Sequence, residues 1–517
     1  MGHKESTAWL ALALVAATGM AAVLMATRQG PGVSPDSVGY IAAARNLLEG
    51  RGFVHEEGPG NFVPITNWPP LYPVALALPG LVGMDPLPGA RAVDAVLLGL
   101  TLLLVGRAVH RRNGRSLVPA LFAMLALGSV CTMLRIHVMA WSESLFVSLT
   151  VFGLVALAHH LDRPAWGWLI VASLATGAAF MTRYPGIALV AAGSLGLLLW
   201  RKGSRWQRLR DGMAFGAVAC LPLFLWMTRN VSTAGTATSR HLVPRLVDAP
   251  HLLEGLETLR AWLVPTTLAH GMKWVVVAAL VAGAVTYVVL RVRNRAVAAD
   301  QEPSPARPGR LLPLLLLFVA MYVGALIGAM TFANPSCDLS ERYLIPILPA
   351  LVVVLTCAAC DQLRAGGRAP AARAVFGVLC VVYVFANLLQ TVPWARDAGD
   401  SGVGFLSRSW RRSPIIARLA ELPLGVPVYS NRGEAIYILT GKSTYSLPLS
   451  DGSERARREL GAVRKGLRED GGVVAYFTRV DRPYLLSQEQ LETALPLRPV
   501  LQARDGALYQ WGAPSAP

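Results

Sequence analysis

The residues with the clearest potential for chemistry lie in the stretch SPDSVGYIAAARNLLEGRGF, which begins at Ser34. Ser34 is suited to cap a helix, Pro35 to occupy its first position, and Asp36 falls in the first turn, where the helix dipole favours an anion. The pattern predicts a helix that Gly50 ends. Asp36 and Tyr40 are four residues apart, so their side chains project from one side of this helix. Asp36 is therefore either a stabiliser of the helix start or a carboxylate presented for reaction.

A wider set of ionisable residues lies at the ends of long apolar runs. A charge inside a bilayer is costly unless it is paired or hydrated. Taken singly, each of these residues is explained as an anchor or an ion-pair partner at the end of a span. Taken together, with both signs at one depth, they indicate a polar cavity that opens outward. The set comprises Asp36, Arg91, Asp94, Arg135, His137, Glu143, Arg183, Arg229, Lys273, Glu341 and Arg342.

The composition places these residues in a membrane protein. Of the 517 residues 54% are hydrophobic and 15% are charged, whereas a soluble chain of this length carries about 25% charged residues. The net charge is +17, but Lys and Arg cluster in short loops between apolar runs. This distribution is typical of membrane topology and argues against nucleic-acid binding. The six cysteines are scattered and predict no disulfide framework.

The apolar runs are long enough to predict about eleven membrane spans. Four basic loops, which begin near Arg107, Arg201, Arg291 and Arg364, all fall on one side when the spans alternate. The positive-inside rule makes that side cytoplasmic and places the amino terminus there as well. The expected spans are 8–27, 89–109, 117–134, 141–160, 165–182, 184–200, 212–229, 272–291, 311–331, 343–360 and 371–391.

The last part of the chain predicts a separate fold. Residues 1–391 form the expected membrane domain, with a first outer loop over 28–89, and residues 392–517 a small extracytoplasmic α/β domain. In this domain we expect strands at 427–431, 471–478 and 509–512 and helices at 432–439 and 487–494. The fold class is thus an α-helical polytopic membrane protein with a small α/β domain on the outer face.

The order of short motifs along the chain is similar to that of the GT-C membrane glycosyltransferases. This superfamily includes the protein O-mannosyltransferases and the bacterial aminoarabinose transferases. The matching pieces are PDSVGYIAAARNLLEGRGF, NWPPLYPVALALPG, RAVDAVLLG, WSESLFVSL, MTRYPGIALV, WMTRN and ERYLIPILPAL. They extend over nearly the whole membrane part, to about residue 391. The resemblance implies a GT-C-like fold and transfer of a sugar from a polyprenyl-phosphate donor on the extracytoplasmic side.

In that family an acidic residue of the first outer loop is the catalytic base, and Asp36 occupies its position. Many members have two adjacent acids there, whereas this chain has Asp36 followed by Ser37. No His/Cys cluster or carboxylate set has metal-ligand spacing, so metal-free chemistry without a cofactor is favoured over use of a divalent metal. The resemblance leaves open whether a hexose or a pentose is transferred, and whether the acceptor is a glycan, a lipid or a protein.

Elementary chemistry gives the other candidates their roles. Transfer of a sugar from a polyprenyl phosphate requires a base near the acceptor hydroxyl and cations near the leaving phosphate. Arg229 and Arg342 are candidates for the phosphate because a guanidinium grips it with two hydrogen bonds, and Lys273 is a further candidate as a point charge. Glu143 either orients the acceptor or holds an arginine. The remaining candidates for lining the cavity are Tyr40, Arg183 and Tyr184.

Two other classes of protein are consistent with charges between membrane helices. A transporter or lipid flippase would show an inverted repeat or paired broken helices, and neither is evident in the sequence. A non-catalytic scaffold would leave Asp36, Arg229 and Arg342 without a role at one depth. The sequence therefore favours the transferase.

Overall fold

The computed structural model describes residues 3–238, 247–264, 309–332, 338–365, 370–423, 425–480 and 482–512. The chain divides into two compact units. The helical unit consists of Met1–Met25, Thr66–Tyr72 and Ala92–Arg396. The α/β unit consists of Ala26–Ile65, Pro73–Arg91 and Asp397–Pro517.

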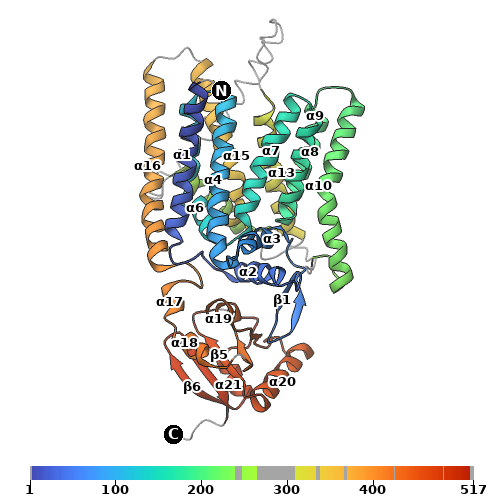
Figure 1. Cartoon of the computed structure of the whole chain (residues 1–517), viewed down its shortest axis with the longest axis vertical. Helices are drawn as coiled ribbons and strands as arrows, with labels where there is room; N and C mark the ends of the chain where they lie inside the picture. The colour runs from blue at the N-terminus through green and yellow to red at the C-terminus, as the bar shows by residue number, and fades with distance from the viewer. Residues whose placement is uncertain are drawn as a thin grey trace. The chain divides into compact units, whose positions relative to one another are not determined.

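Long apolar helices that run side by side make up the helical unit (Figure 1). Small residues permit their close approach, as is usual between membrane helices. Gly177 lies against the backbone of Ala219, where an added Cβ would lie 3.1 Å from the carbonyl oxygen, and Gly193 lies under the ring of Phe215. The helices are α1 (His3–Ala26), α4 (Pro86–Arg112), α5 (Leu117–Ser129), α6 (Cys131–Val138), α7 (Ser142–Asp162), α8 (Trp166–Phe180), α9 (Ile187–Trp200), α10 (Arg205–Ala234), α13 (Leu311–Phe332), α15 (Leu348–Ala365) and α16 (Pro370–Ser401).

Shorter elements join these helices. They are α3 (Leu71–Ala77), η1 (Leu78–Val82), η2 (Tyr184–Gly186), α11 (Ala249–Leu263), α14 (Glu341–Leu344) and η4 (Ile345–Ile347). Of these, η2 and α14 each place an arginine next to the start of α7.

The predicted class of helical membrane protein is confirmed, but the count of eleven spans is not. Among the described residues, seven helices are long and apolar enough to cross a membrane, or eight if α5 and α6, bent by 63°, form one span. Helices α8 and α9 are shorter because the chain is extended at Arg183 and then passes Pro185. The predicted span at 272–291 lies outside the described residues.

The α/β unit contains a five-stranded sheet in the order β4-β3-β5-β7-β6. Strand β3 pairs in parallel with β4 and β5, and β7 pairs antiparallel with β5 and β6. The strands are β3 (Val428–Ser430), β4 (Tyr445–Ser446), β5 (Val473–Phe477), β6 (Leu497–Ala503) and β7 (Gly506–Trp511), and the helices are α17 (Arg408–Arg411), α18 (Pro414–Glu421), α19 (Gly433–Thr440), α20 (Glu454–Glu469) and α21 (Gln488–Ala494).

Successive side chains along each strand point to opposite faces of the sheet. Both faces are apolar, and each is covered by helices. Val474 belongs to one core cluster with Leu467 of α20 and Leu491 of α21. Its neighbour Val473 belongs to the other, with Ile415 of α18. The predicted strands and helices of this domain are confirmed, whereas α17, α18, α20, β4 and β6 were not predicted.

Of the predicted first outer loop (28–89), residues 28–65 and 73–89 belong to the α/β unit and Thr66–Tyr72 to the helical unit. The loop contains α2 (Pro35–Leu48) and the hairpin of β1 (Val54–Glu56) and β2 (Phe62–Pro64). The predicted helix start is confirmed: Ser34 and Ser37 form a reciprocal capping box, with Pro35 in the first position. Gly50, with φ of 75°, follows the end of the helix. The compact units thus group most of this loop with the tail, while the predicted domain division at residue 391 stays a prediction.

Candidate functional site

The centre of the candidate site is Glu143, in the first turn of α7. Its side chain is fully buried, with 0% exposure, and one oxygen, Oε1, forms two ion pairs. Nη1 of Arg183 lies 2.5 Å from that oxygen, and Nε of Arg342 donates to it as well. Arg183 stands at the start of η2 and Arg342 in α14, so three distant parts of the chain meet at one carboxylate.

Aromatic rings and a hydroxyl fix the two guanidinium groups. The centre of the Trp141 ring lies 4.4 Å from Arg342, and that of Tyr343 lies 5.8 Å from Arg183. Arg183 also donates to Oγ of Ser142 at 3.1 Å. Two positive charges face one carboxylate, so the cluster carries a net positive charge of one. Such a cluster is suited to an anion.

Arg342 also lines a cavity of about 280 Å³. Within it Arg135 pairs with Glu341 at 3.2 Å, and Thr132 donates to the same carboxylate at 2.9 Å. Burial and the nearby Asp338 raise the pKa of Glu254 above its usual value. The lining residues are Thr132, Arg135, Ile136, Trp141, Glu254, Thr258, Ser340, Glu341 and Arg342. Cations, carboxylates, hydroxyls and an indole ring together are typical of sites for anionic or sugar-bearing ligands.

A buried hydroxyl–carboxyl cluster supports the turn that leads into α7. Asp94 is fully buried and accepts hydrogen bonds from the Tyr72 hydroxyl at 3.1 Å and from Oγ of Ser144 at 2.6 Å. Ser144 Oγ also lies 2.9 Å from the carbonyl oxygen of Trp141. The Tyr72 side chain is completely buried against Asp94.

The structure assigns the other predicted residues to different places. Asp36 and Tyr40 lie on α2 of the α/β unit, Asp36 half-buried in the first turn and Tyr40 buried. Arg229, near the end of α10, stacks 4.8 Å from the ring centre of Trp226 and donates to Oδ1 of Asn230 at 3.1 Å. Tyr184 and Trp226 pack against the same apolar cluster between α8, α9 and α10. Lys273 lies outside the described residues.

Sequence reasoning missed the role of Trp141 and of the pair Arg135–Glu341. Their positions in the sequence could have pointed to them. Trp141 stands two residues before Glu143, and Glu341 directly precedes Arg342. Adjacent charges of opposite sign face different partners here, because Glu341 binds Arg135 while Arg342 binds Glu143.

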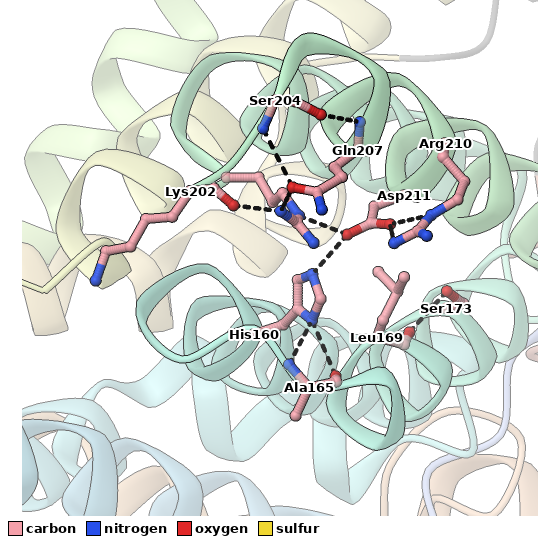
Figure 2. A network of polar contacts seen from close by, with 10 residues as sticks. His160, Ala165, Leu169, Ser173, Lys202, Ser204, Gln207, Arg210 and Asp211 are labelled. Carbon is pink, nitrogen blue, oxygen red and sulfur yellow. Dashed lines mark hydrogen bonds and ion pairs between the residues drawn. The ribbon is translucent and has the colours of Figure 1, made fainter.

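A second buried carboxylate of the helical unit is Asp211, in the first turns of α10 (Figure 2). It accepts from Nε of Arg201 at 2.6 Å and from both Nε and Nη2 of Arg210, and Nε2 of His160 lies 3.5 Å away. Arg201 Nη1 also donates to Oε1 of Gln207 at 3.0 Å. Gln207 in turn closes the capping box of α10 with Ser204. This cluster ties the loop between α9 and α10 to the end of α7.

The described residues contain no group of three or more His, Cys, Asp or Glu side chains placed to hold a metal ion. Five of the six cysteines lie among these residues, and all five are free. Metal-free chemistry remains a prediction.

The fold and the cluster at Glu143 together define a polytopic membrane protein with a buried arginine–carboxylate site. The fold is that of the GT-C membrane glycosyltransferases, as the sequence motifs predicted. Residues 67–228 match the family model described as dolichyl-phosphate-mannose-protein mannosyltransferase. No curated protein matches the chain by sequence.

Solved structures of low sequence identity share the fold. Apo ArnT from Cupriavidus metallidurans is 15% identical, with 98% of each chain covered and a TM-score of 0.64. The same enzyme bound to undecaprenyl phosphate is 13% identical, with 96% of this chain and 97% of that chain covered and a TM-score of 0.61. The arabinofuranosyltransferase AftD from Mycobacteria is 13% identical, with a TM-score of 0.52, and the match covers 97% of this chain but 40% of that one.

Proposed function

We propose that this chain is a glycosyltransferase that takes a sugar from a polyprenyl-phosphate donor and transfers it to an acceptor hydroxyl on the extracytoplasmic face of the membrane. The observation that carries the proposal is the ion-pair cluster of Glu143 with Arg183 and Arg342, next to a cavity of about 280 Å³. Undecaprenyl phosphate bound to ArnT, which shares the fold, supports the class of donor.

The arrangement suits the leaving phosphate. As the bond between the anomeric carbon and the phosphate oxygen breaks, its electron pair moves to the phosphate and negative charge develops there. Preorganised cations in a site of low dielectric constant stabilise such charge most strongly. Arg342 lines the cavity and has 25% of its side chain exposed. Its guanidinium is therefore the group we assign to the phosphate, with Arg183 behind it and Arg229 and Lys273 as further candidates.

Glu143 has a positioning role in this proposal. Its carboxylate touches both guanidinium groups and is completely shielded from solvent. A single carboxylate between two arginines offsets their mutual repulsion and fixes their orientation while leaving one positive charge in excess. We therefore assign Glu143 to the arginines and leave the acceptor to residues elsewhere, with Tyr40 and Tyr184 as candidates for lining its path.

We assign the proton transfer to Asp36. The acceptor oxygen attacks the anomeric carbon, its proton passes to the Asp36 carboxylate, and the sugar–phosphate bond breaks on the opposite face, so the configuration inverts. The products are the glycosylated acceptor and the polyprenyl phosphate. Asp36 is half-buried in the first turn of a capped helix, which orients its carboxylate.

Replacement of Asp36 tests the proposal. In membranes that contain equal amounts of each variant, sugar transfer from a polyprenyl-phosphate donor should fall about 10² to 10⁴-fold in Asp36→Asn. Asn retains hydrogen bonding at the helix start but takes no proton. Glu49→Gln is the matched control, because Glu49 lies at the other end of α2 and pairs with Arg51 at the surface. Transfer by Asp36→Asn within a few-fold of the parent would remove Asp36 as the base.

A further inference from the structure

The segment just before α2 is fixed by a turn of the tail. Val33 and Gly404 form a parallel bridge within the α/β unit. The amide of Phe405 donates to the carbonyl oxygen of Val33 at 2.8 Å, and the Val33 amide donates to Val403 at 3.4 Å. Val33 directly precedes Ser34, the cap of the helix that carries Asp36. The tail therefore holds the backbone three residues before this carboxylate.

Only glycine fits at position 404. Its φ is +63°, a left-handed conformation that glycine adopts without steric cost. A Cβ at this position would lie 2.0 Å from the Val33 carbonyl oxygen and 2.8 Å from the carbonyl carbon. Those atoms are backbone and have no rotamer to change. A side chain at 404 therefore displaces the chain at Val33.

The turn itself is anchored to the sheet. The Phe405 ring packs edge-on against Trp410 at 5.4 Å between centroids, and Trp410 packs on Phe477 of β5 at 5.1 Å. Arg411 adds two hydrogen bonds to Gln29, one of them to Oε1 at 2.8 Å. The turn is thus the stiffer partner, because aromatic packing connects it to the core of the domain.

The far end of α2 is fixed in the same unit. Arg45 donates from Nε and Nη2 to both carboxylate oxygens of Asp85, at 2.8 and 2.9 Å. Its guanidinium lies 5.7 Å from the ring centre of Tyr437 on α19. The hydrogen bonds from Arg45 keep the pKa of Asp85 below its usual value in spite of burial. Helix α2 is therefore held at both ends.

We infer that the turn 403–405, with Gly404 at its centre, is a positioning element for catalysis that sets the location of Asp36 through Val33. This inference rests on the proposed role of Asp36 as the base. The tail contacts the segment before α2 and Arg45 near the end of this helix, so it holds the helix that carries Asp36 at both ends. A displacement of about 1 Å in a reacting group can cost about a hundredfold in rate.

The test compares two glycine substitutions that differ in what the new methyl group meets. Gly404→Ala pushes on Val33. Gly441→Ala is the matched control, because Gly441 also has a positive φ, of +74°, in the same domain but has nothing within 4 Å of the added Cβ. We expect the kcat for sugar transfer to fall about 10- to 100-fold in Gly404→Ala, with little change in the KM for the donor. Gly441→Ala should stay within about threefold of the parent.

Measuring Gly404→Ala in combination with Asp36→Asn shows whether its loss of kcat depends on Asp36. If it does, Gly404→Ala should lower kcat in the parent but not further in Asp36→Asn, since residues that act as a unit are not additive. Equal losses in both backgrounds, or equal kcat for Gly404→Ala and Gly441→Ala, would overturn the positioning role while leaving the proposed function intact. Full activity of Asp36→Asn would instead remove Asp36 as the base in the proposed function.

A milder variant covers the case in which Gly404→Ala does not accumulate in the membrane. Arg411→Ala removes the hydrogen bonds to Gln29 from an exposed position, so the protein should still fold. We expect a loss in kcat of about threefold to tenfold that disappears in the Asp36→Asn background. An unchanged kcat in Arg411→Ala would contradict the inference.

Discussion

Glu143 and Asp211 are both buried carboxylates that bind two arginines within the helical unit, yet their surroundings differ. The partners of Asp211 make further contacts with the protein itself: Arg201 binds Gln207 and the carbonyl of Lys202 (Figure 2). Arg210 packs 4.7 Å from the centre of the Trp166 ring. At Glu143, by contrast, Arg342 lines a cavity.

We therefore take the cavity beside Arg342, and not the ion-pair cluster itself, as the feature that separates the two carboxylates. Each cluster has two arginines for one carboxylate, so the count of charges does not separate them. A buried ion pair is also weak evidence for stability, because the cost of desolvation offsets much of the attraction. We therefore expect the same chemical change to impair catalysis at one carboxylate and folding at the other.

Of the changes at the two clusters and the cavity, the largest effect is expected for Glu143→Gln. The neutral amide leaves two guanidinium groups side by side without a counter-charge, so they repel and lose their common orientation. The kcat/KM for transfer from the lipid donor should fall about 10² to 10³-fold. Transfer at a rate within fivefold of the parent, at equal protein in the membrane, would show that the cluster is structural.

Asp211→Asn is the matched change at the other cluster. It leaves the mostly buried Arg201 without its carboxylate, which should lower the free energy of unfolding by about 3–5 kcal/mol. Thermal unfolding in detergent measures this loss. The kcat per folded molecule should remain that of the parent, since neither Arg201 nor Arg210 lines the cavity beside Arg342. A reduced kcat in the folded fraction would place Asp211 in the catalytic machinery and remove the contrast.

Arg342→Lys should raise the KM for the donor about 10- to 50-fold, because an ammonium group makes no bidentate contact with phosphate and does not stack on Trp141 in the same way. Arg210→Lys is the control at the Asp211 cluster, where the arginine is half-exposed and should tolerate the change. Initial rates over a range of donor concentrations measure both. Equal KM values for the two variants would argue against phosphate binding by Arg342.

The smallest effect is a pH dependence at the cavity. Burial and Asp338 raise the pKa of Glu254 above its usual value of 4.5. The carboxyl group therefore loses its proton at a higher pH than an ordinary glutamate does. As the pH rises through the raised pKa, Glu254 gains a negative charge and donor affinity should fall about twofold to fivefold. The KM for the donor should thus increase with pH in the parent and lose this increase in Glu254→Gln. An unaltered pH profile in that variant would assign the dependence to another group.

The sequence predicts the structural features that depend on residues close together along the chain. Ser34, Pro35 and Ser37 specify the start of α2 through local hydrogen bonds and a fixed φ, so this helix was predicted correctly. Strands β3 and β5 are likewise evident from short apolar runs between turn residues. The presence of long membrane helices follows from apolar length alone.

The pairing of charges could not be predicted in this way. Arg342 and Glu143 are 199 residues apart, and Thr132 and Glu341 are 209 apart, so their contacts depend on how the helices pack. Asp94 appeared only as one ionisable residue among several, because nothing local links it to Tyr72. The count of spans was also uncertain for a physical reason: Arg183 and Pro185 interrupt an apolar stretch that hydropathy alone reads as two full spans.

The most direct test of the contrast between the two clusters is a structure of the whole chain with a polyprenyl phosphate bound. The account predicts that phosphate oxygens accept hydrogen bonds from Arg342, with Glu143 still paired to Arg183, and that the surroundings of Asp211 stay unchanged. A phosphate held elsewhere, for example by Lys273 alone, with Arg342 still directed only at Glu143, would contradict it.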